Sequence, residues 1–297
     1  MKDVVYDLET NDPDDLFTLC LLAAHPEVNL LGVTIVPGSK HQISLVKHVL
    51  KLLGKDIPVA GRNIDHPKEC VSGFHYKWLG KIAGEDNGDG TPVDILKSIY
   101  DSNPDTIQIT GAPLHNIYEF IMSGGNIKTW MAQGGFVGSN IIPEDKQLEK
   151  FKGMVTCPTF NLGGNKKASI YLVNCKEIES KFFVSKNICH GMIYDNEMHE
   201  IIKPFRYNNA GINMIYEGMT KYLNKKSEGK KFHDPLAACT AIDNSICEFE
   251  DVELYYQKGK WGSRKSDNIN VKISIDVDKN KFLNVLVGGK NEISSNI

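Results

Sequence analysis

The chain has 297 residues, of which 41% are hydrophobic and 24% are charged, an ordinary composition for a globular protein with a sizeable core. Its formal net charge is −3 and its basic residues are dispersed, so a surface for nucleic acid is not indicated. No linker or internal repeat divides the chain convincingly. We therefore expect one domain over residues 1–297, acting on a small molecule.

Cysteine usage and the N-terminal residues predict a cytoplasmic protein. The seven cysteines are scattered and include no C-x-x-C pair, so buried reduced thiols are expected. A strand is predicted almost from the first residue, which leaves no room for a signal peptide. No apolar run is long enough to span a bilayer, so we expect no membrane partner.

The first sixty residues alternate between apolar strands and helical segments. Strands are predicted at 3–7, 30–36 and 57–60, and helices at 13–24 and 42–53. This order of buried strands and helices is typical of a parallel, Rossmann-like sheet. Ligands of such sheets bind beyond the carboxyl ends of the strands, so the polar turns there are the candidate site.

The rest of the chain continues the alternation, with loop-rich stretches at 62–91 and 136–166. Further strands are predicted at 106–110, 128–132, 181–184, 252–257 and 270–275, and further helices at 92–100, 114–122, 167–173, 207–223, 233–242 and 279–286. We therefore predict an α/β fold in which helices flank an open, mixed and mostly parallel sheet.

The turn after the first strand concentrates five carboxylates within nine residues: Asp7, Glu9, Asp12, Asp14 and Asp15. Asp12 fits a helix N-cap, and Asp14 and Asp15 suit the first helical turn. That interpretation leaves out Asp7 and Glu9, which are costly at a strand end without partners. A hard cation would relieve the repulsion, and the lack of Cys or His nearby favours Ca²⁺ or Mg²⁺ over zinc.

Two other segments carry polar groups at comparable positions. His233 and Asp234 open an apolar helix, and the sequence favours a structural cap and a functional pair about equally. Gly111 follows a buried strand, where it serves either a tight turn or a cation that needs a backbone carbonyl. Periodicity does not separate these alternatives.

These segments together resemble the inosine–uridine-preferring nucleoside hydrolase family. Its D-x-D-P-x-x-D-D, G-P-L-T-N-I, M-G-G…G-N, E-F-N and H-D-P-x-A motifs look like residues 7–15, 112–117, 133–140, 159–161 and 233–237, respectively. The similar segments occur in the family's order and span nearly the whole chain. The resemblance implies an α/β enzyme that hydrolyses the N-glycosidic bond of a ribonucleoside.

The resemblance also implies a Ca²⁺ cofactor. Carried over position by position, the calcium ligands fall on Glu9, Asp15, the carbonyl of Gly111 and Asp234. Asp7 then becomes a partner behind the ligands. Glu9 stands where the family has Asp. The spacing from Glu9 to Asp14 and Asp15 is one residue longer than in the family motif.

The ribose and the leaving base have implied partners as well. The groups that contact the ribose hydroxyls fall on Asp14 and Asn161, and Asn140 falls near the 5′ end of the sugar. The general base falls on Glu9. The acid that protonates the leaving base in one branch of the family falls on His233.

Three further positions depart from the family pattern around the sugar and base. Ser39 replaces an asparagine after the second strand, Gln133 replaces a methionine, and Thr159 replaces the acid that reads the 5′-hydroxyl. We therefore hypothesise a modified purine or 7-deazapurine nucleoside, such as queuosine, or a 5′-substituted nucleoside as substrate. Hydrolysis of ordinary purine and pyrimidine nucleosides is the alternative.

Two other functions and the assembly state stay open at this point. The strand through Asp7 and Glu9 also looks like the D-x-E-T strand of a DEDD-type 3′–5′ exonuclease, although antiparallel strands follow it there. Because Glu9 replaces the family's Asp, a non-catalytic nucleoside- or ribose-binding protein of the same fold is a further alternative. By resemblance alone, a homodimer or homotetramer is expected.

Overall fold

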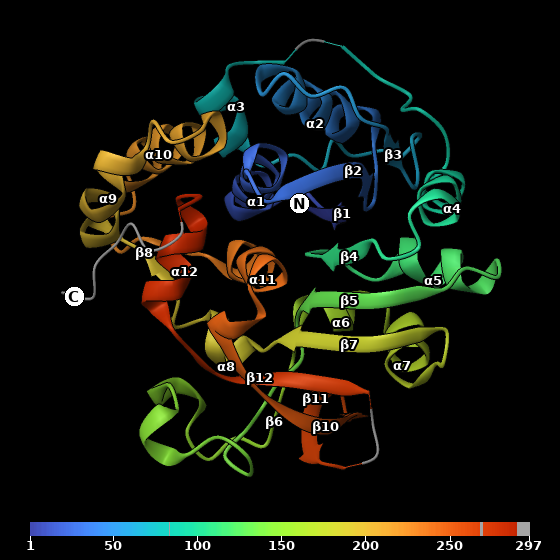
Figure 1. Ribbon diagram of the computed structural model, residues 1–297, viewed down its shortest axis with the longest axis vertical. Helices are drawn as coiled ribbons and strands as arrows, with labels where there is room; N and C mark the ends of the chain where they lie inside the picture. The colour runs from blue at the N-terminus through green and yellow to red at the C-terminus, as the bar shows by residue number, and fades with distance from the viewer. Residues whose placement is uncertain (83, 268–269, 290–297) are drawn as a thin grey trace.

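A ten-stranded sheet runs through the molecule and collects strands from both ends of the chain (Figure 1). The computed structural model describes residues 1–82, 84–267 and 270–289. In spatial order the strands are β3 (Val59–Gly61), β2 (Val28–Ile35), β1 (Lys2–Leu8), β4 (Ile107–Thr110), β5 (Ile127–Gln133), β7 (Ile178–Val184), β12 (Val271–Val277), β10 (Cys247–Gln257), β11 (Lys260–Lys265) and β6 (Thr156–Cys157). A separate antiparallel pair joins β8 (Ile193–Tyr194) to β9 (Lys230–Lys231).

The sheet is mixed and mostly parallel, as predicted. Every neighbouring pair from β3 to β12 is parallel. The additions β10, β11 and β6 are antiparallel. Strand β1 is buried along most of its length, as expected of a central parallel strand covered on both faces. The parallel order brings the carboxyl ends of β1, β4, β5 and β7 to one edge.

Helices cover both faces of the sheet. They are α1 (Pro13–Ala24), α2 (Lys40–Leu52), α3 (Gly73–Leu79), α4 (Pro92–Ser102), α5 (His115–Met122), α6 (Phe160–Gly164), α7 (Lys166–Asn174), α8 (Lys186–Cys189), α9 (Asn196–Ile202), α10 (Ala210–Leu223), α11 (His233–Ile242) and α12 (Lys279–Leu286). In Figure 1, α1 and α11 lie side by side, while α4, α5 and α7 lie toward the opposite side of the sheet. Both α1 and α11 are almost wholly buried, because other helices enclose them.

The stretch 62–91, predicted as a loop, contains helix α3. The Ser72 hydroxyl accepts a hydrogen bond from the N–H of Phe74 at 3.3 Å and caps the helix. Trp78 of α3 packs on Phe17 of α1, with ring centroids 5.1 Å apart. The aromatic residues of this stretch therefore stabilise the helix that carries the acidic turn. A seven-residue helix that depends on such packing leaves little periodicity to detect.

Other differences from the prediction involve short or polar elements. The stretch 136–166 contains β6, α6 and two 3₁₀ turns, and the helix predicted from 207 begins at Ala210. Strand β11 was not predicted. It pairs with β10 across a turn in which Lys258 and Gly259 both have positive φ, 48° and 82°. That conformation is typical of a tight hairpin. Over the ranges that the structure describes, no helix is both long and apolar enough to cross a membrane.

Candidate active site

The acidic turn after β1 meets the N-terminus of α11 at the carboxyl edge of the parallel strands. Gly111, directly after β4, donates its backbone N–H to the carbonyl oxygen of Asp7 at 2.9 Å. The carboxylate of Asp234 lies against the same glycine, since a Cβ built on Gly111 would stand 2.4 Å from Asp234 Oδ2. A residue with a side chain would push this carboxylate away from the strand end. Gly111 thus permits the contact between β4 and α11.

Asp15 and Asp234 face each other from the first turns of α1 and α11. Their carboxyl groups are close enough for one to hydrogen-bond to the other when protonated, and both residues are buried. Burial, followed by the charge of Asp234, raises the pKa of Asp15 well above its usual value. Burial, followed by the charge of Asp14, does the same to the pKa of Asp234. A hydrogen bond between two carboxyl groups requires that one of them be protonated.

Asp7, in β1, and Glu9, directly after it, lie on the same side of the site. We call this group of acids, Asp7, Glu9, Asp12, Asp14, Asp15 and Asp234, the acidic side. Burial and the charges of neighbouring aspartates, Asp12 first, raise the pKa of Glu9 to about 7. Asp7 Oδ1 accepts hydrogen bonds from Thr34 Oγ1 at 2.6 Å and from Asn116 Nδ2 at 2.7 Å. Burial nevertheless raises the pKa of Asp7 to about 7, and its Oδ2 has no partner in the described part of the chain. Asp7 is thus fully buried and acts on Glu9 through its charge, and its predicted place behind the metal ligands stays a prediction.

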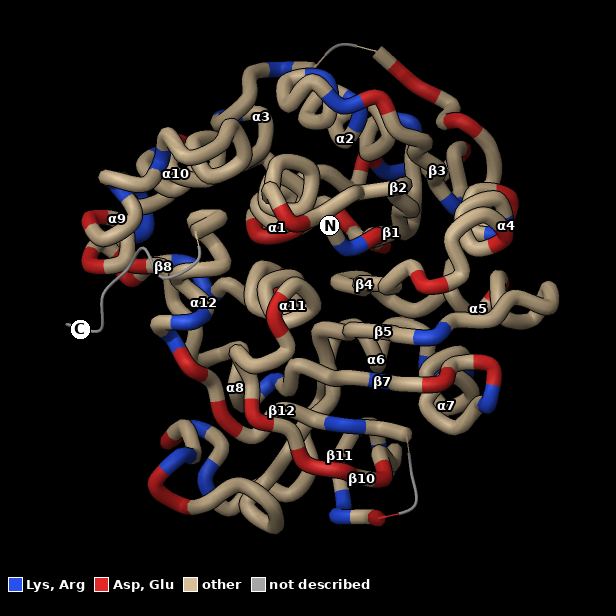
Figure 2. Tube along the Cα trace, viewed as in Figure 1, with Lys and Arg blue, Asp and Glu red and all other residues tan. Residues whose placement is uncertain are grey.

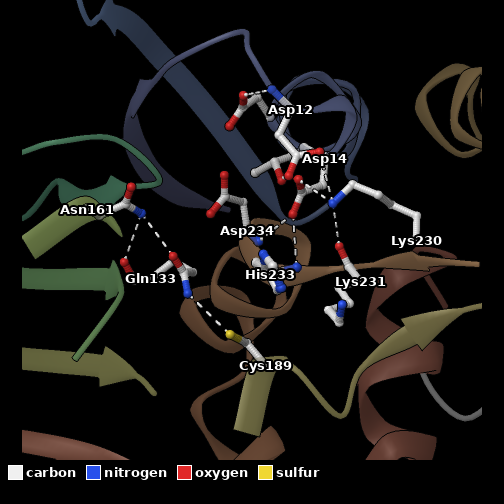
Figure 3. A network of polar contacts seen from close by, with 11 residues as sticks. Asp12, Asp14, Gln133, Asn161, Cys189, Lys230, Lys231, His233 and Asp234 are labelled. Atoms are coloured by element: carbon white, nitrogen blue, oxygen red, sulfur yellow. Dashed lines mark hydrogen bonds and ion pairs between the residues drawn. The ribbon is translucent and has the colours of Figure 1, made fainter. Parts of the chain in front are cut away.

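A buried lysine that the sequence did not point to neutralises part of this charge. Lys230 Nζ, from β9, lies 2.9 Å from Asp14 Oδ1 and 3.0 Å from Asp12 Oδ1 (Figure 3). Asp14 Oδ2 accepts the backbone N–H groups of His233 at 2.9 Å and Asp234 at 3.2 Å. Although burial raises the pKa of Asp14, Lys230 more than offsets it and holds that pKa below its usual value. Asp14 is therefore an ionised link between α1, β9 and α11.

Asp12 occupies the predicted N-cap position of α1, but its side chain has another partner. Its backbone N–H donates to Asp15 Oδ2 at 3.1 Å, and its own carboxylate pairs with Lys230. Nothing in the sequence marks Lys230, because adjacent lysines ahead of a helix usually lie in solvent. In β9, which pairs with β8, Lys230 is buried and Lys231 is exposed, as the alternation of side chains along a strand requires.

His233 stands at the start of α11 with its ring stacked on a second histidine. The ring centroids of His233 and His190 are 4.9 Å apart, with an interplanar angle of 28°. Burial lowers the pKa of His233 to about 4, against an opposing effect of Asp14. Burial, then the charges of His233 and Lys150, lowers the pKa of His190 to about 3. Both rings are therefore neutral near pH 7. His190, which directly follows α8, was not predicted.

Gln133 and Asn161 form a polar bridge on the β5 side of the site. Asn161 Nδ2 donates to Gln133 Oε1 at 2.9 Å and to its carbonyl at 3.1 Å, while Gln133 Nε2 donates to Cys189 Sγ at 3.2 Å. Figure 3 shows the Asn161 amide and the Asp234 carboxylate facing each other across the site. Thr159, at the N-cap of α6, is 6% exposed, and its Oγ1 lacks a hydrogen-bond partner among the described residues.

Two predicted site residues have their side chains bound elsewhere in the protein. Ser39 caps α2 and donates its hydroxyl to the carbonyl of Glu69 at 2.6 Å, which fastens the loop before α3. Asn140 is exposed and donates to the carbonyl of Ser263 in β11 at 2.8 Å. The structure thus joins Asp14, Asp15, Gly111, His233 and Asp234 by contacts and places Glu9 near enough to interact with Asp14 and Asp15 through its charge, whereas Ser39 and Asn140 have contacts outside that group.

The acidic side offers only oxygen ligands. Carboxylates from Glu9, Asp15 and Asp234 and a carbonyl from Gly111 are the ligand types of hard cations such as Ca²⁺ and Mg²⁺. Within the described ranges, no three acidic, histidine or cysteine side chains are already arranged to coordinate a metal ion. The carboxyl groups of Asp15 and Asp234 contact each other instead. A cation in place of their shared proton would relieve the repulsion. The chemistry of the donors fits a hard cation.

Comparison with known proteins identifies the family. The model of the inosine-uridine preferring nucleoside hydrolases matches residues 4–284. The chain belongs to this family. It is therefore an N-glycosyl hydrolase of nucleosides, as its motifs predicted, and the exonuclease alternative is wrong. The strands agree, since α1 follows β1 directly and β1 pairs in parallel with β2 and β4.

Individual relatives are distant in sequence but similar along their whole length. An uncharacterised protein of Aquifex aeolicus (strain VF5) is 26% identical over 283 residues, which cover 92% of this chain and 94% of that protein. An inosine-guanosine nucleoside hydrolase has a similar structure, with a TM-score of 0.73 and 14% identity over 97% of this chain and 98% of its own. A purine-preferring ribonucleoside hydrolase from Gardnerella vaginalis has a TM-score of 0.70 and 16% identity over 97% of each chain. These structures show the same fold.

Proposed function

We propose that this hydrolase releases the base from a non-standard ribonucleoside, with Ca²⁺ as its cofactor. The base that we favour is a modified purine or 7-deazapurine, as in queuosine, and a 5′-substituted nucleoside is the other form. One contrast carries the proposal: the acidic turn keeps its carboxylates, whereas Gln133 and Thr159 depart from the family pattern around the sugar and base. Ser39 also departs from that pattern, but its hydroxyl is engaged by Glu69. The reaction is kept, and the substrate differs.

The calcium ligands are the carboxylates of Glu9, Asp15 and Asp234 and the carbonyl of Gly111. The support is that these acids are buried at one point, where burial first and charge repulsion second raise the pKa of Asp15 and Asp234. When bound, Ca²⁺ would supply charge that polarises the ribose hydroxyls and lowers the pKa of the attacking water.

Glu9 takes the proton from the attacking water. In the protein without a cation, burial first and then neighbouring aspartates raise its pKa to about 7, which indicates a carboxylate that is basic enough to accept this proton. The transition state of N-glycoside hydrolysis resembles an oxocarbenium ion, so the surrounding carboxylates also stabilise the positive charge that develops on the ribose. A glutamate here therefore has two roles at neutral pH.

Asp14 and Asn161 hold the ribose. An ionised carboxylate accepts about four hydrogen bonds. Asp14 uses three, from Lys230 and from the N–H groups of His233 and Asp234, so one acceptor position remains for a ribose hydroxyl. Asn161 directs both donor contacts of its amide to Gln133, which leaves Oδ1 as an acceptor on the site side.

His233 assists departure of the base as a neutral hydrogen-bond donor. Its pKa of about 4 means that few imidazolium ions exist at pH 7, so the ring donates an N–H rather than acting as a strong acid. The stack with His190 fixes the plane of the ring. A base whose nitrogen needs only a hydrogen bond to leave fits this donor.

A nucleoside panel tests the substrate. Purified protein with Ca²⁺ is incubated with inosine, adenosine, uridine, queuosine and further modified purine and 7-deazapurine nucleosides, and free base is quantified by chromatography. We expect kcat/KM to be highest for a modified purine or 7-deazapurine nucleoside. Faster cleavage of inosine and uridine than of every modified nucleoside would establish the ordinary-nucleoside alternative. Metal analysis of the purified protein, before and after chelation, tests Ca²⁺ separately.

Location and assembly are further parts of the proposal. All seven cysteines are free, which suits a reducing compartment, and we propose the cytoplasm. The family resemblance supports a homodimer or homotetramer, which sedimentation analysis of the purified protein distinguishes from a monomer.

A further inference from the structure

Three lysines beside the stacked histidines lack any carboxylate partner among the described residues. Lys150 Nζ contacts His190 Nδ1 at 2.6 Å, and Lys186 Nζ donates to the carbonyl of Pro158 at 2.8 Å. Lys231 is exposed and directly follows Lys230, but Asp12 and Asp14 pair only with Lys230. We call Lys150, Lys186 and Lys231 the lysine cluster. It lies outside the acidic turn and has no part in the roles assigned above.

The members of the lysine cluster are close enough to repel one another. The charges of Lys231 and Lys186 contribute, after burial, to lowering the pKa of Lys150. All three lysines contribute to the low pKa of His190. Ten lysines of the described ranges lie within 4.0 Å of a carboxylate, among them Lys152, which pairs with Glu149 at 2.6 Å. The lysine cluster differs from the other unpaired lysines because its three members all act on one histidine, His190. Repulsion left without a counter-charge is a cost to folding that a bound anion would remove.

A second observation at the same place also points to a ligand. Thr159 follows Pro158, the residue whose carbonyl holds Lys186, and its buried Oγ1 has no hydrogen-bond partner among the described residues. Buried hydroxyl groups are almost always hydrogen-bonded. His190 adds a further donor, because a neutral ring that accepts from Lys150 at Nδ1 carries its proton on Nε2. The group thus consists largely of donors.

The stack of His190 on His233 joins the lysine cluster to the reaction site. A ligand there is also part of the substrate, or lies next to it. A polyanion is a poor fit, because the buried carboxylates of Asp14 and Asp234 are close by and Figure 2 shows Lys and Arg scattered among acidic residues along the trace. A single anionic group suits three lysines and a hydroxyl.

We infer that Lys150, Lys186 and Lys231, with the hydroxyl of Thr159, bind an anionic oxygen group carried by the substrate. This rests on the proposed hydrolysis of a nucleoside and narrows its substrate class to nucleosides that bear a negative charge. A phosphate on the ribose and a carboxylate on the base share the required chemistry: several acceptor oxygens with charge for lysine and hydroxyl donors. Either group, when bound, would offset the repulsion among the three lysines by accepting charge-assisted hydrogen bonds from them.

Calorimetry on the calcium-loaded, full-length protein tests this inference. The probes are two matched pairs: ribose 5-phosphate against ribose, and succinyladenosine against adenosine. We expect at least one anionic member to bind roughly tenfold more tightly than its neutral counterpart, the gain typical of one charge-assisted hydrogen bond. The phosphate pair and the carboxylate pair distinguish the two sources of the anion. Equal affinities within both pairs would overturn the inference.

Variants locate the binding group. Lys186→Gln and Lys150→Gln should each lower the ratio of anionic to neutral affinity by about fivefold or more, and Thr159→Val should lower it less. Lys152→Gln is the matched control: it lies in the same loop, has a carboxylate partner, and should keep the wild-type ratio. Retention of the full ratio by the Lys150 and Lys186 variants, with unchanged melting temperatures, also overturns the inference.

The outcomes separate this inference from the proposed function. If the protein hydrolyses neutral nucleosides and shows no preference for anionic ones, the proposed reaction stands and the anion site is refuted. Tight binding of an anionic probe by a protein that releases no base keeps the anion site and removes the proposed reaction.

Discussion

The two sides of His233 handle charge in opposite ways. On the acidic side, Lys230 Nζ meets Asp12, Asp14 and the carbonyl of Lys231 at about 3 Å, so its charge is satisfied within the protein. On the other side, no lysine of the lysine cluster has a carboxylate within 4.0 Å among the described residues. A charge with partners of this quality indicates a structural role. A group of like charges without partners indicates that the counter-charge comes from outside the chain.

The same criterion divides the acids themselves. Asp14 is held ionised by Lys230 and by two backbone N–H groups. Glu9, Asp15 and Asp234 have raised pKa values, caused first by burial, with no lysine or arginine among the lowering causes for Glu9 or Asp15. These three acids are the ones assigned to a cation. The following experiments remove or supply charge on each side.

The largest expected effect comes from Glu9→Gln. Loss of the general base should lower kcat by roughly 10²- to 10⁴-fold in a base-release assay. Because burial and neighbouring aspartates disfavour the charge of Glu9, the metal-free variant should unfold at a denaturant concentration no lower than the wild type. A fully active Glu9→Gln protein would remove Glu9 from its proposed role, and a control variant at exposed Glu197 should leave kcat unchanged.

Lys230→Met should destabilise the fold more than any other single lysine change. The variant leaves Asp14 buried and without its cation, which typically costs about 3–5 kcal/mol in the free energy of unfolding. Urea denaturation measures the difference. Combining it with Asp14→Asn should recover part of the loss, because the uncompensated charge is then gone. The matched control is Lys203→Met, whose partner Glu200 lies in solvent, with an expected change within about 1 kcal/mol.

Calcium should stabilise the wild-type protein and not a variant without its ligands. At a Ca²⁺ concentration about a hundred times the dissociation constant, the gain is about 2.7 kcal/mol, seen as a rise in melting temperature over protein in chelator. Asp15→Asn should abolish most of that rise. A rise of the same size in the variant would show that calcium binds elsewhere.

The long elements and the acidic turn could be predicted because local patterns determine them. Strand β1 is a continuous apolar run, and Pro13 after Asp12 marks the start of α1. The helix α11 was predicted from its apolar run, and its His-Asp start from the family motif. Parallel strands then bring these segments to one edge without further information. The family motif and this edge together placed Glu9, Asp15, Gly111 and Asp234 in one region, and their role as calcium ligands stays a proposal.

Lys230 and the lysine cluster could not be predicted, because their roles depend on tertiary contacts. The inward turn of Lys230 depends on a two-residue pairing of β9 with β8, too short to leave a sequence pattern. Lys150 and His190 meet over a separation of 40 residues. Ser39 shows the converse: its place after β2 predicted a substrate contact, but local capping chemistry engages the hydroxyl.

His75 gives the acidic side a pH dependence of its own. The residue is buried in α3, and burial lowers its pKa to about 4 from an ordinary value near 6.5. The unfolded chain therefore takes up the proton first, so stability from this group is full above pH 6.5 and is lost as pH falls toward 4. The loss amounts to about 3 kcal/mol. His75→Gln should reduce the acid sensitivity of unfolding by that amount; parallel wild-type and variant curves over this range would contradict it.

Gln133→Met should have the smallest effect, and one confined to binding. The change removes the Oε1 acceptor of Asn161 and the donor to Cys189 while keeping a side chain of similar size. Asn161 keeps its bond to the Gln133 backbone carbonyl, so its amide is oriented less firmly rather than lost. One hydrogen bond of about 1 kcal/mol corresponds to about a fivefold rise in KM with little change in kcat. A fall in kcat with KM unchanged would instead show that the Gln133–Asn161 hydrogen bond acts in the chemical step. Gln133 would then belong with the reacting groups, alongside Glu9.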